Sequence, residues 1–238
     1  MSALAGQVAL VTGAGRGIGR AVARALAAEG ATVVLAARTR SELAAAAEEI
    51  RGAGAQAFAV PTDVTQDRAV GALVDEAVGR FERLDVLVNA AGTASFGTFA
   101  ESKADDWDGM LAVNLRATMV TCRAVLPVML RQGRGTIVNV ASIAATRPIP
   151  GAAVYAATKA GVLTFSRVLA EEVRPAVRVG VVVPGAVDTP LWDTVPGGPD
   201  RARMLRPADV ARAVVLMAAL PSGAALEEVR LLPAGGIL

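Results

Sequence analysis

Seven short runs of apolar, largely β-branched residues recur along the chain, separated by segments whose apolar residues repeat at helical spacing. The runs are nearly continuous rather than alternating, which is the pattern of strands that are covered on both faces. Strands that alternate with helices in this way are typical of a parallel sheet with helices on each side. We therefore predict an α/β fold, a doubly wound parallel sheet with helices on both faces, with strands at residues 7–12, 32–37, 56–60, 84–92, 135–142, 177–184 and 228–233.

Length and composition indicate one domain. The chain has 238 residues, of which 53% are hydrophobic and 19% charged, so it is too apolar for disorder. We find no linker or charge block and predict a single domain over residues 1–238. The long irregular stretch 185–206 is rich in Pro and Gly and follows the carboxyl end of a predicted strand. Open α/β sheets bind ligands there, so we interpret the stretch as a substrate lid, a plain surface loop being the alternative.

Charge and residue usage exclude several function classes. The formal net charge is only +2 and the basic residues are scattered, which argues against nucleic-acid binding. The chain has no histidine, so it has neither a Ser-His-Asp triad nor a His-ligated metal, and we expect no metal site.

The single cysteine, Cys122, forms no internal disulfide, and we find no apolar run approaching the roughly 18 residues of a membrane span. The N-terminus lacks a basic segment, and we expect a cytoplasmic protein.

A glycine-rich segment, TGAGRGIG at residues 12–19, lies between the first predicted strand and the first predicted helix. In that position, backbone N–H groups and the helix N-terminus face a pyrophosphate, and glycines permit the tight turn and close approach. The lysine of a P-loop is absent. We predict a dinucleotide site that includes Gly13, Gly15, Arg16, Gly17, Ile18 and Gly19, with a tight turn that binds nothing as the alternative.

The end of the second predicted strand indicates which dinucleotide is bound. An acidic residue there typically holds the ribose 2′-hydroxyl of NAD, but this chain has Ala36, Ala37 and Arg38. A carboxylate would repel a 2′-phosphate, whereas Arg38 and Arg16 are suited to binding it. We therefore favour NADP(H) over NAD(H). A solvated Arg38 without a ligand is the alternative.

The only tyrosine, Tyr155, and one of the two lysines, Lys159, are four residues apart in a segment that suits a buried helix. An ammonium about 4 Å from a phenol stabilises the phenolate by on the order of 4 kcal/mol, enough to lower its pKa by about two to three units. We therefore expect Lys159 to make Tyr155 a usable general acid or base. A core tyrosine beside an incidental surface lysine is the alternative. Ser142 closes the fifth predicted strand on the ligand side of the sheet.

Taken together, these motifs resemble the short-chain dehydrogenase/reductase superfamily, including its 3-oxoacyl-carrier-protein reductase-like members. The matching residues are TGAGRGIG, Asp63, NAAG at 89–92, Asn114, Ser142, YAATK at 155–159 and PGAVDT at 184–189. The resemblance implies a Rossmann-type sheet and a catalytic set of Asn114, Ser142, Tyr155 and Lys159. It implies that Ser142 polarises the carbonyl and that Tyr155 donates the proton. It also implies that Lys159 holds the nicotinamide ribose and that Asn114 supports a water-linked proton relay.

The resemblance extends the cofactor site beyond the glycine loop. It places Asp63 and Val64 at the adenine, Asn89 beside the cofactor, and Pro184, Gly185, Val187 and Thr189 at the nicotinamide. Alternatively, Asp63 stabilises a loop and Asn89 satisfies backbone groups at a strand end. The chain departs from the family in NAAG, where NNAG is frequent, and in a shortened carboxyl end without the usual TG and VDGG motifs.

We thus predict an NADP(H)-dependent oxidoreductase that acts on a small-molecule carbonyl or secondary alcohol, with a ketone or 3-oxoacyl substrate preferred. The alternatives are a non-catalytic NADP(H)-sensing protein and an NAD-dependent alcohol or sugar dehydrogenase. We expect substrate walls from Thr93–Phe99, Ile143–Gly151 and the 185–206 stretch, with an apolar lining and Arg147 available to an anionic group. The resemblance implies a homotetramer or homodimer. Recruitment of an acidic carrier protein by Arg131, Arg134, Arg174 and Arg178 competes with a solvated basic face.

Overall fold

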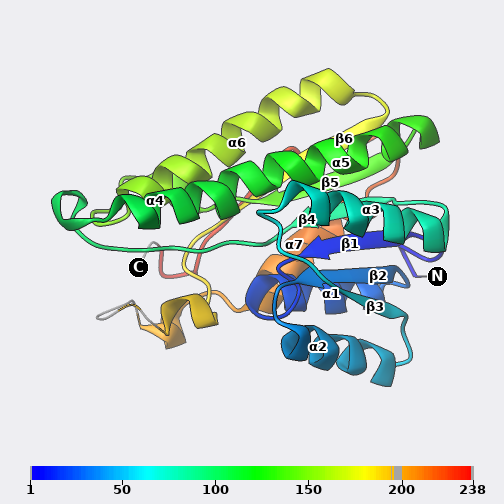
Figure 1. Ribbon diagram of the computed structural model, residues 1–238, viewed down its shortest axis with the longest axis horizontal. Helices are drawn as coiled ribbons and strands as arrows, with labels where there is room; N and C mark the ends of the chain where they lie inside the picture. The colour runs from blue at the N-terminus through cyan, green and yellow to red at the C-terminus, as the bar shows by residue number, and fades with distance from the viewer. Residues whose placement is uncertain (1, 194, 196–199, 237–238) are drawn as a thin grey trace.

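The computed structural model describes residues 2–193, 195 and 200–236. Its sheet has seven strands in the order β3-β2-β1-β4-β5-β6-β7, all paired in parallel, which confirms the predicted fold class (Figure 1). The strands are β1 (Val8–Thr12), β2 (Thr32–Ala37), β3 (Ala57–Pro61), β4 (Val86–Asn89), β5 (Gly135–Val140), β6 (Val177–Pro184) and β7 (Glu228–Leu231). The α-helices are α1 (Gly17–Ala28), α2 (Arg40–Gly52), α3 (Asp67–Phe81), α4 (Ala104–Met110), α5 (Ala117–Gln132), α6 (Ala153–Val173) and α7 (Pro207–Ala219).

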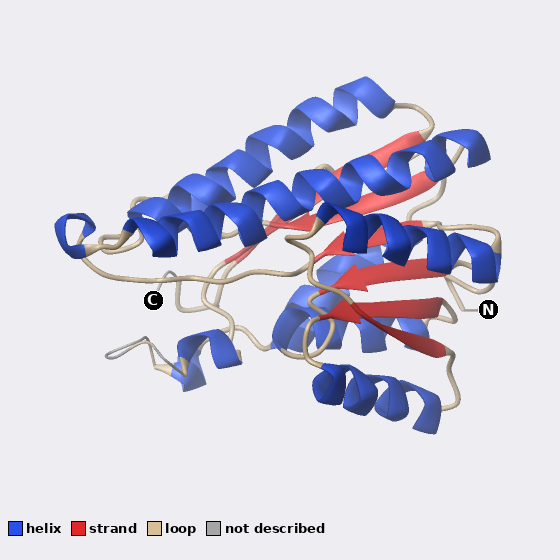
Figure 2. Cartoon of the chain, viewed as in Figure 1, coloured by secondary structure: helices blue, strands red, loops and turns tan. Residues whose placement is uncertain are grey.

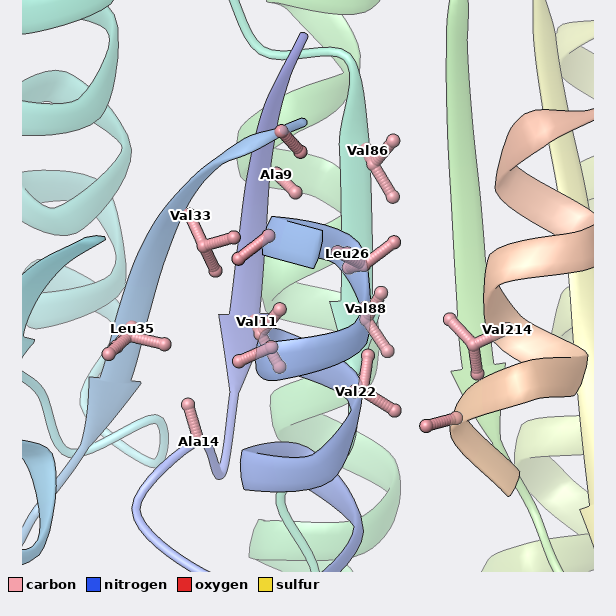
Figure 3. Close-up of a cluster of buried hydrophobic side chains, with 14 of the residues drawn as sticks. Ala9, Val11, Ala14, Val22, Leu26, Val33, Leu35, Val86, Val88 and Val214 are labelled. Carbon is pink, nitrogen blue, oxygen red and sulfur yellow. The ribbon is translucent and has the colours of Figure 1, made fainter. Parts of the chain in front are cut away.

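Helices cover both faces of the sheet, as the continuous apolar runs predict (Figure 2). On one face, Ala9 and Val11 of β1 belong to a core cluster with residues of α1, α2 and α7 (Figure 3). On the other face, Val8 and Leu10 of the same strand pack with residues of α3, α5 and α6. Because successive side chains of a strand point to opposite faces and both faces are covered, the strands are apolar at most positions.

The core fixes α1, and thereby the glycine loop, against the sheet. Val22 and Leu26 of α1 are fully buried beside Val11 and Val88 (Figure 3). Truncating a buried leucine to alanine typically costs about 2–5 kcal/mol, so Leu26 is a strong anchor for this helix. The start of α1 therefore has a fixed position at the carboxyl end of β1.

The strand order reverses direction between β1 and β4, which are neighbours although two strands separate them in the sequence. The Thr12 hydroxyl accepts hydrogen bonds from the backbone N–H groups of Ala90, at 3.2 Å, and Ala91, at 3.3 Å, and so joins the end of β1 to the loop that follows β4. Residues 90–92 are therefore loop rather than strand, and β4 is shorter than predicted. Open α/β sheets bind ligands at such a switch point.

Residues 104–132 form a continuous helical run in which a π-helical turn, Leu111–Arg116, joins α4 to α5. By length and mean composition, an 18-residue window in this run is apolar enough to cross a membrane, although polar and charged residues interrupt it. This is weak evidence for a membrane span, since core helices pass the same test and 44% of the window is buried. Val125 and Met129 of α5 are fully buried against the sheet, which explains the apolar composition.

Candidate functional site

A cavity of about 790 Å³ lies along the carboxyl edge of the sheet and is lined by the segments that follow β1 to β6. Its volume falls within the roughly 300–1,000 Å³ of ligand pockets in proteins. Most of the predicted site residues line it: Gly13, Gly15, Arg16, Gly17, Ile18, Gly19, Arg38, Asp63, Val64, Ser142, Tyr155, Lys159, Pro184, Gly185, Val187 and Thr189. Asn89 and Asn114 are not among the lining residues.

The glycine loop depends on residues without side chains. Gly13 and Gly17 have φ angles of +67° and +55°, which other residues rarely adopt. A Cβ at Gly13 would lie 2.7 Å from the backbone of Ala91, and a Cβ at Gly19 would lie 2.2 Å from the carbonyl oxygen of Gly13. The loop therefore packs backbone against backbone and leaves the N-terminus of α1 open toward the cavity.

Exposed arginines stand at the glycine-loop end of the cavity. Arg16 and Arg38 line the cavity and are exposed, and neither forms an ion pair within the described part of the chain. Asp63 accepts hydrogen bonds from Thr65, from its N–H at 3.0 Å and its hydroxyl at 2.8 Å. The hydrogen bond from the Thr65 backbone N–H is the largest cause of the lowered pKa of Asp63. The positive charge of Arg38 also lowers this pKa. Asp63 thus stabilises its loop and also lines the cavity.

Sequence reasoning missed one residue at this end, Glu42. It comes from the first turn of α2 and lines the cavity beside the glycine loop. The signal available in the sequence was its place four residues after Arg38, at the start of the helix that follows β2. An acidic residue at the third helical position is usually assigned to capping, which hides this role.

Tyr155 and Lys159 lie one turn apart on α6 at the other end of the cavity. Lys159 is only 5% exposed, and its Nζ donates a hydrogen bond to the carbonyl oxygen of Val140 at 2.9 Å. The Nζ atom is 5.8 Å from the centroid of the Tyr155 ring. Ser142 caps the 3-10 turn Ile143–Ala145, where its Oγ accepts from the N–H of Ala144 at 3.2 Å. The structure therefore brings the three predicted side chains to one wall.

The pKa values correct one prediction. Burial raises the pKa of Tyr155, and the neighbouring Ser142 hydroxyl acts in the opposite direction. Burial also lowers the pKa of Lys159, to about 8. The expectation that Lys159 makes the phenol more acidic is therefore wrong for the protein by itself, because burial disfavours both charged forms and the ammonium is directed to Val140.

Asn114 lies behind this wall, in the π-helical turn. Its Oδ1 accepts from the N–H of Thr93, and its Nδ2 donates to the carbonyl oxygen of Thr93, both at 2.9 Å. A Cβ placed at Gly92 would lie 3.5 Å from Asn114 Oδ1 and 3.7 Å from Lys159 Nζ, so both side chains approach Gly92. Single π-helical turns inside α-helices occur frequently at functional sites.

The structure does not place the Asn89 side chain in the cavity. Its Nδ2 donates to Asn139 Oδ1 at 2.9 Å, and its Oδ1 accepts from the Thr121 hydroxyl at 2.6 Å. Asn139 in turn donates to Ser166 of α6 at 2.8 Å. Asn89 thus belongs to a buried network that ties β4 and β5 to α5 and α6, rather than to the cavity lining.

Aromatic rings line the cavity beside Tyr155. Phe96 stacks on Trp192, with ring centroids 5.5 Å apart and an interplanar angle of 8°, and its centroid is 5.7 Å from that of Tyr155. The indole Nε1 donates to the carbonyl oxygen of Val187 at 3.0 Å, which fixes Trp192. Of the predicted apolar walls, the cavity includes Ile143, Ile149, Leu191 and Trp192, but neither Met204, which is buried elsewhere, nor Arg147.

The described parts of the 185–206 stretch are held at both ends. Val187 and Leu205 form an isolated parallel bridge, in which the Asp188 N–H donates to the Leu205 carbonyl oxygen at 2.8 Å. Arg201 contacts Asp188 at 2.6 Å and Asp193 at 2.8 Å. The predicted lid also includes residues 194 and 196–199, which lie outside the described residues.

The four arginines considered for carrier recruitment do not form a free basic face. Arg178 donates to the carbonyl oxygens of Leu220, Pro221 and Ala224 at the end of α7. Arg174 pairs with Glu171 and Glu227, and Arg134 approaches Asp85 at 3.7 Å. Three of the four arginines thus have partners within the chain.

The arrangement combines a backbone cradle for an anion, a pair of basic residues, and the hydroxyls of Ser142 and Tyr155 beside a buried lysine. The described residues contain no group of three or more His, Cys, Asp or Glu side chains that could hold a metal ion. The site is therefore equipped to bind a dinucleotide and to exchange a proton with a polar oxygen.

Comparison with known proteins gives a consistent result. Residues 7–198 match the family model described as short chain dehydrogenase. The chain is 37% identical over 234 residues to an uncharacterised oxidoreductase of Staphylococcus aureus, covering 98% of this chain and 100% of that protein. It is 39% identical over 218 residues to the ketoacyl reductase HetN of a Nostoc species, covering 90% and 76%. A crystal structure of a metagenomic short-chain oxidoreductase in complex with NADP is 38% identical, has a TM-score of 0.87, and is matched over 98% of this chain and 99% of that one.

Proposed function

This chain belongs to the short-chain dehydrogenase family and is an oxidoreductase, and from this we propose that it transfers a hydride between NADP(H) and a ketone or 3-oxoacyl compound. One observation carries the proposal. Ser142, Tyr155 and Lys159 converge on one wall of a cavity whose other end is a glycine loop at the N-terminus of α1.

The residues present fit a nicotinamide dinucleotide. Lys159 is a buried ammonium with three N–H donors, and in the described residues only the Val140 carbonyl oxygen accepts from it. Ribose hydroxyls are suitable acceptors for the remaining donors. We propose that the glycine loop holds the pyrophosphate, Asp63 and Val64 the adenine, and Val187 and Thr189 the carboxamide. When bound, the nicotinamide supplies or accepts the hydride.

Tyr155 is suited to the proton-donor role in carbonyl reduction. Because burial raises its pKa, the phenol remains protonated at neutral pH and can donate its proton to the developing alkoxide. Ser142 would polarise the carbonyl oxygen from the same wall, and the buried surroundings strengthen both interactions. We assign Asn114 to a supporting position behind Lys159 and Gly92, where a water-linked proton relay would begin.

Two observations support the substrate class, and two more support the cofactor preference. The cavity wall above Tyr155 is apolar and aromatic, through Ile143, Ile149, Phe96 and Trp192, which favours a ketone over a polyhydroxy sugar. The relative HetN, which is named a ketoacyl reductase, also supports a ketone or 3-oxoacyl substrate. For the cofactor, Arg16 and Arg38 line the glycine-loop end, and the related metagenomic oxidoreductase was solved with NADP.

The test is NADPH oxidation over a panel of ketones and 3-oxoacyl thioesters by wild-type protein and Tyr155→Phe. We expect the variant to lose about 10²–10⁴-fold in kcat while its Kd for NADPH is unchanged. Thr164→Ala removes an exposed hydroxyl from the same helix and should have no effect. Cofactor binding without turnover of any substrate would instead support a non-catalytic sensor, and turnover of alcohols or sugars with NAD would support the NAD-dependent alternative.

We also propose that the protein acts as a homodimer or homotetramer. Leu111, Met119, Leu130 and Val168 are 38–54% exposed on the helical layer formed by α4, α5 and α6. A second copy of this layer would cover them. Light scattering of wild type and Val168→Glu tests this, since the charged variant should dissociate the assembly.

The free, buried Cys122 agrees with a reducing compartment, and we propose a cytoplasmic location. Cell fractionation would test it.

A further inference from the structure

Glu42 holds a carboxylate against the glycine loop. It is half-buried, lines the cavity and belongs to the first turn of α2. A Cβ placed at Gly15 would lie 2.9 Å from Glu42 Oε2 and 3.0 Å from Glu42 Cβ. No left-handed φ is recorded for Gly15, so a side chain there would meet Glu42 rather than strain the backbone.

The carboxylate has no internal role that explains this position. Thr39 and Glu42 have the spacing of a capping box, yet the N-terminus of α2 shows no side-chain capping hydrogen bond. Elsewhere on α2, Glu48 pairs with Arg51, and Glu49 pairs with Arg20 and Arg24. Within the described residues, Glu42 forms neither an ion pair nor a hydrogen bond. Its oxygens are therefore available to whatever enters the cavity.

Residues of opposite charge line the glycine-loop end of the cavity. Arg16 and Arg38 line the same end and attract a phosphate. An ionised carboxylate only accepts hydrogen bonds, so it favours a hydroxyl and opposes a phosphate. The part of a dinucleotide that differs in this respect is the adenosine ribose, which carries a 2′-hydroxyl in NADH and a 2′-phosphate in NADPH.

We propose that Glu42 is a specificity-determining residue for the cofactor, and this rests on the proposed function. It accepts a hydrogen bond from the ribose 2′-hydroxyl of NADH and repels the 2′-phosphate of NADPH. The two arginines act in the opposite direction. The chain therefore binds both dinucleotides with a moderate preference for NADPH, rather than excluding NADH.

Calorimetric titration of Glu42→Gln with NADPH, NADH and adenosine 2′,5′-bisphosphate tests the proposal without measuring turnover. Glutamine keeps the size of the side chain and removes its charge. We expect the variant to bind NADPH and the bisphosphate about three- to tenfold more tightly than wild type, the range of a partly screened charge. NADH should bind more weakly. Glu48→Gln, the same change on the outer face of α2, should leave all three Kd values unchanged.

The proposal is overturned if Glu42→Gln leaves the NADPH-to-NADH ratio of Kd values as it is in wild type, or tightens both dinucleotides equally. Glu42→Asp, which withdraws the charge by one methylene, is a second variant and should shift the ratio in the same direction by less. Wild-type protein that binds neither dinucleotide would instead overturn the proposed function, and the inference with it.

Discussion

The two ends of the cavity handle charge in opposite ways. At the Tyr155 end, Lys159 is 5% and Ser142 9% exposed, and burial shifts the pKa values of both Tyr155 and Lys159. At the glycine-loop end, Arg16 and Arg38 are exposed and lie in reach of solvent. An interaction between charges is several times stronger in a buried site than in water. We infer that the Tyr155 end determines the rate of the reaction, whereas the glycine-loop end selects among ligands with smaller energies.

The largest expected effect is that of Lys159→Met, which removes the buried ammonium. We expect kcat/KM to fall by about 10²–10³-fold, as for the loss of a fixed electrostatic group in a dry site. Lys103→Met is the matched control, because Lys103 is the other lysine and is exposed. Near-wild-type activity in Lys159→Met would show that burial at this end confers no catalytic advantage.

The second-largest effect should come from a substitution that creates a clash with the backbone of the glycine loop. In Gly19→Ala, the new Cβ would lie 2.2 Å from the Gly13 carbonyl oxygen, so the loop must shift. We expect a loss of about 1–3 kcal/mol of stability, together with weaker NADPH binding. Gly71→Ala in α3 meets nothing within 4 Å and should stabilise the protein by about 0.5–1 kcal/mol. Urea denaturation measures the stability of each variant, and calorimetry measures its NADPH binding. Equal effects of Gly19→Ala and Gly71→Ala would contradict the prediction.

The pH dependence of stability tests the burial of Lys159 directly. Its pKa is 10.5 in the unfolded chain and about 8 in the folded protein, so between these values the unfolded chain binds more protons and stability rises with pH. Between pH 7.5 and 9.5 the free energy of unfolding of wild type should gain about 2 kcal/mol relative to Lys159→Met. Cys122 and Tyr155 are present in both proteins, so their titrations cancel in the comparison. A constant difference across this range would mean that the ammonium is solvated.

The smallest effect should come from an exposed arginine. We expect Arg38→Ala to raise the Kd for NADPH by about fivefold at low salt, in keeping with the roughly 1 kcal/mol of a solvent-exposed ion pair. The difference should shrink in 1 M salt, where screening acts within about 3 Å, and the Kd for NADH should change less. Arg40→Ala, an exposed neighbour outside the cavity lining, is the control. An effect that salt does not reduce would mean that Arg38 acts in a buried contact.

Much of the architecture followed from the sequence because it depends on local patterns. The seven apolar runs became the seven strands, with differences only at their ends, since strands covered on both faces are nearly continuously apolar. The glycine loop was predictable because a tight turn between a strand and a helix favours glycines, and Gly13 and Gly17 do adopt positive φ angles there. The Tyr155 and Lys159 spacing likewise follows from one helical turn.

What only the tertiary structure decided concerns the surroundings of individual side chains. Asn89 forms hydrogen bonds with Asn139 and Thr121, and Glu42 lies against Gly15. Both contacts depend on how separate elements pack, because that packing sets where each side chain points. The pKa directions of Tyr155 and Lys159 belong to the same class. A sequence shows that a phenol and an ammonium are four residues apart, but burial and hydrogen-bond partners determine which charged form is stable.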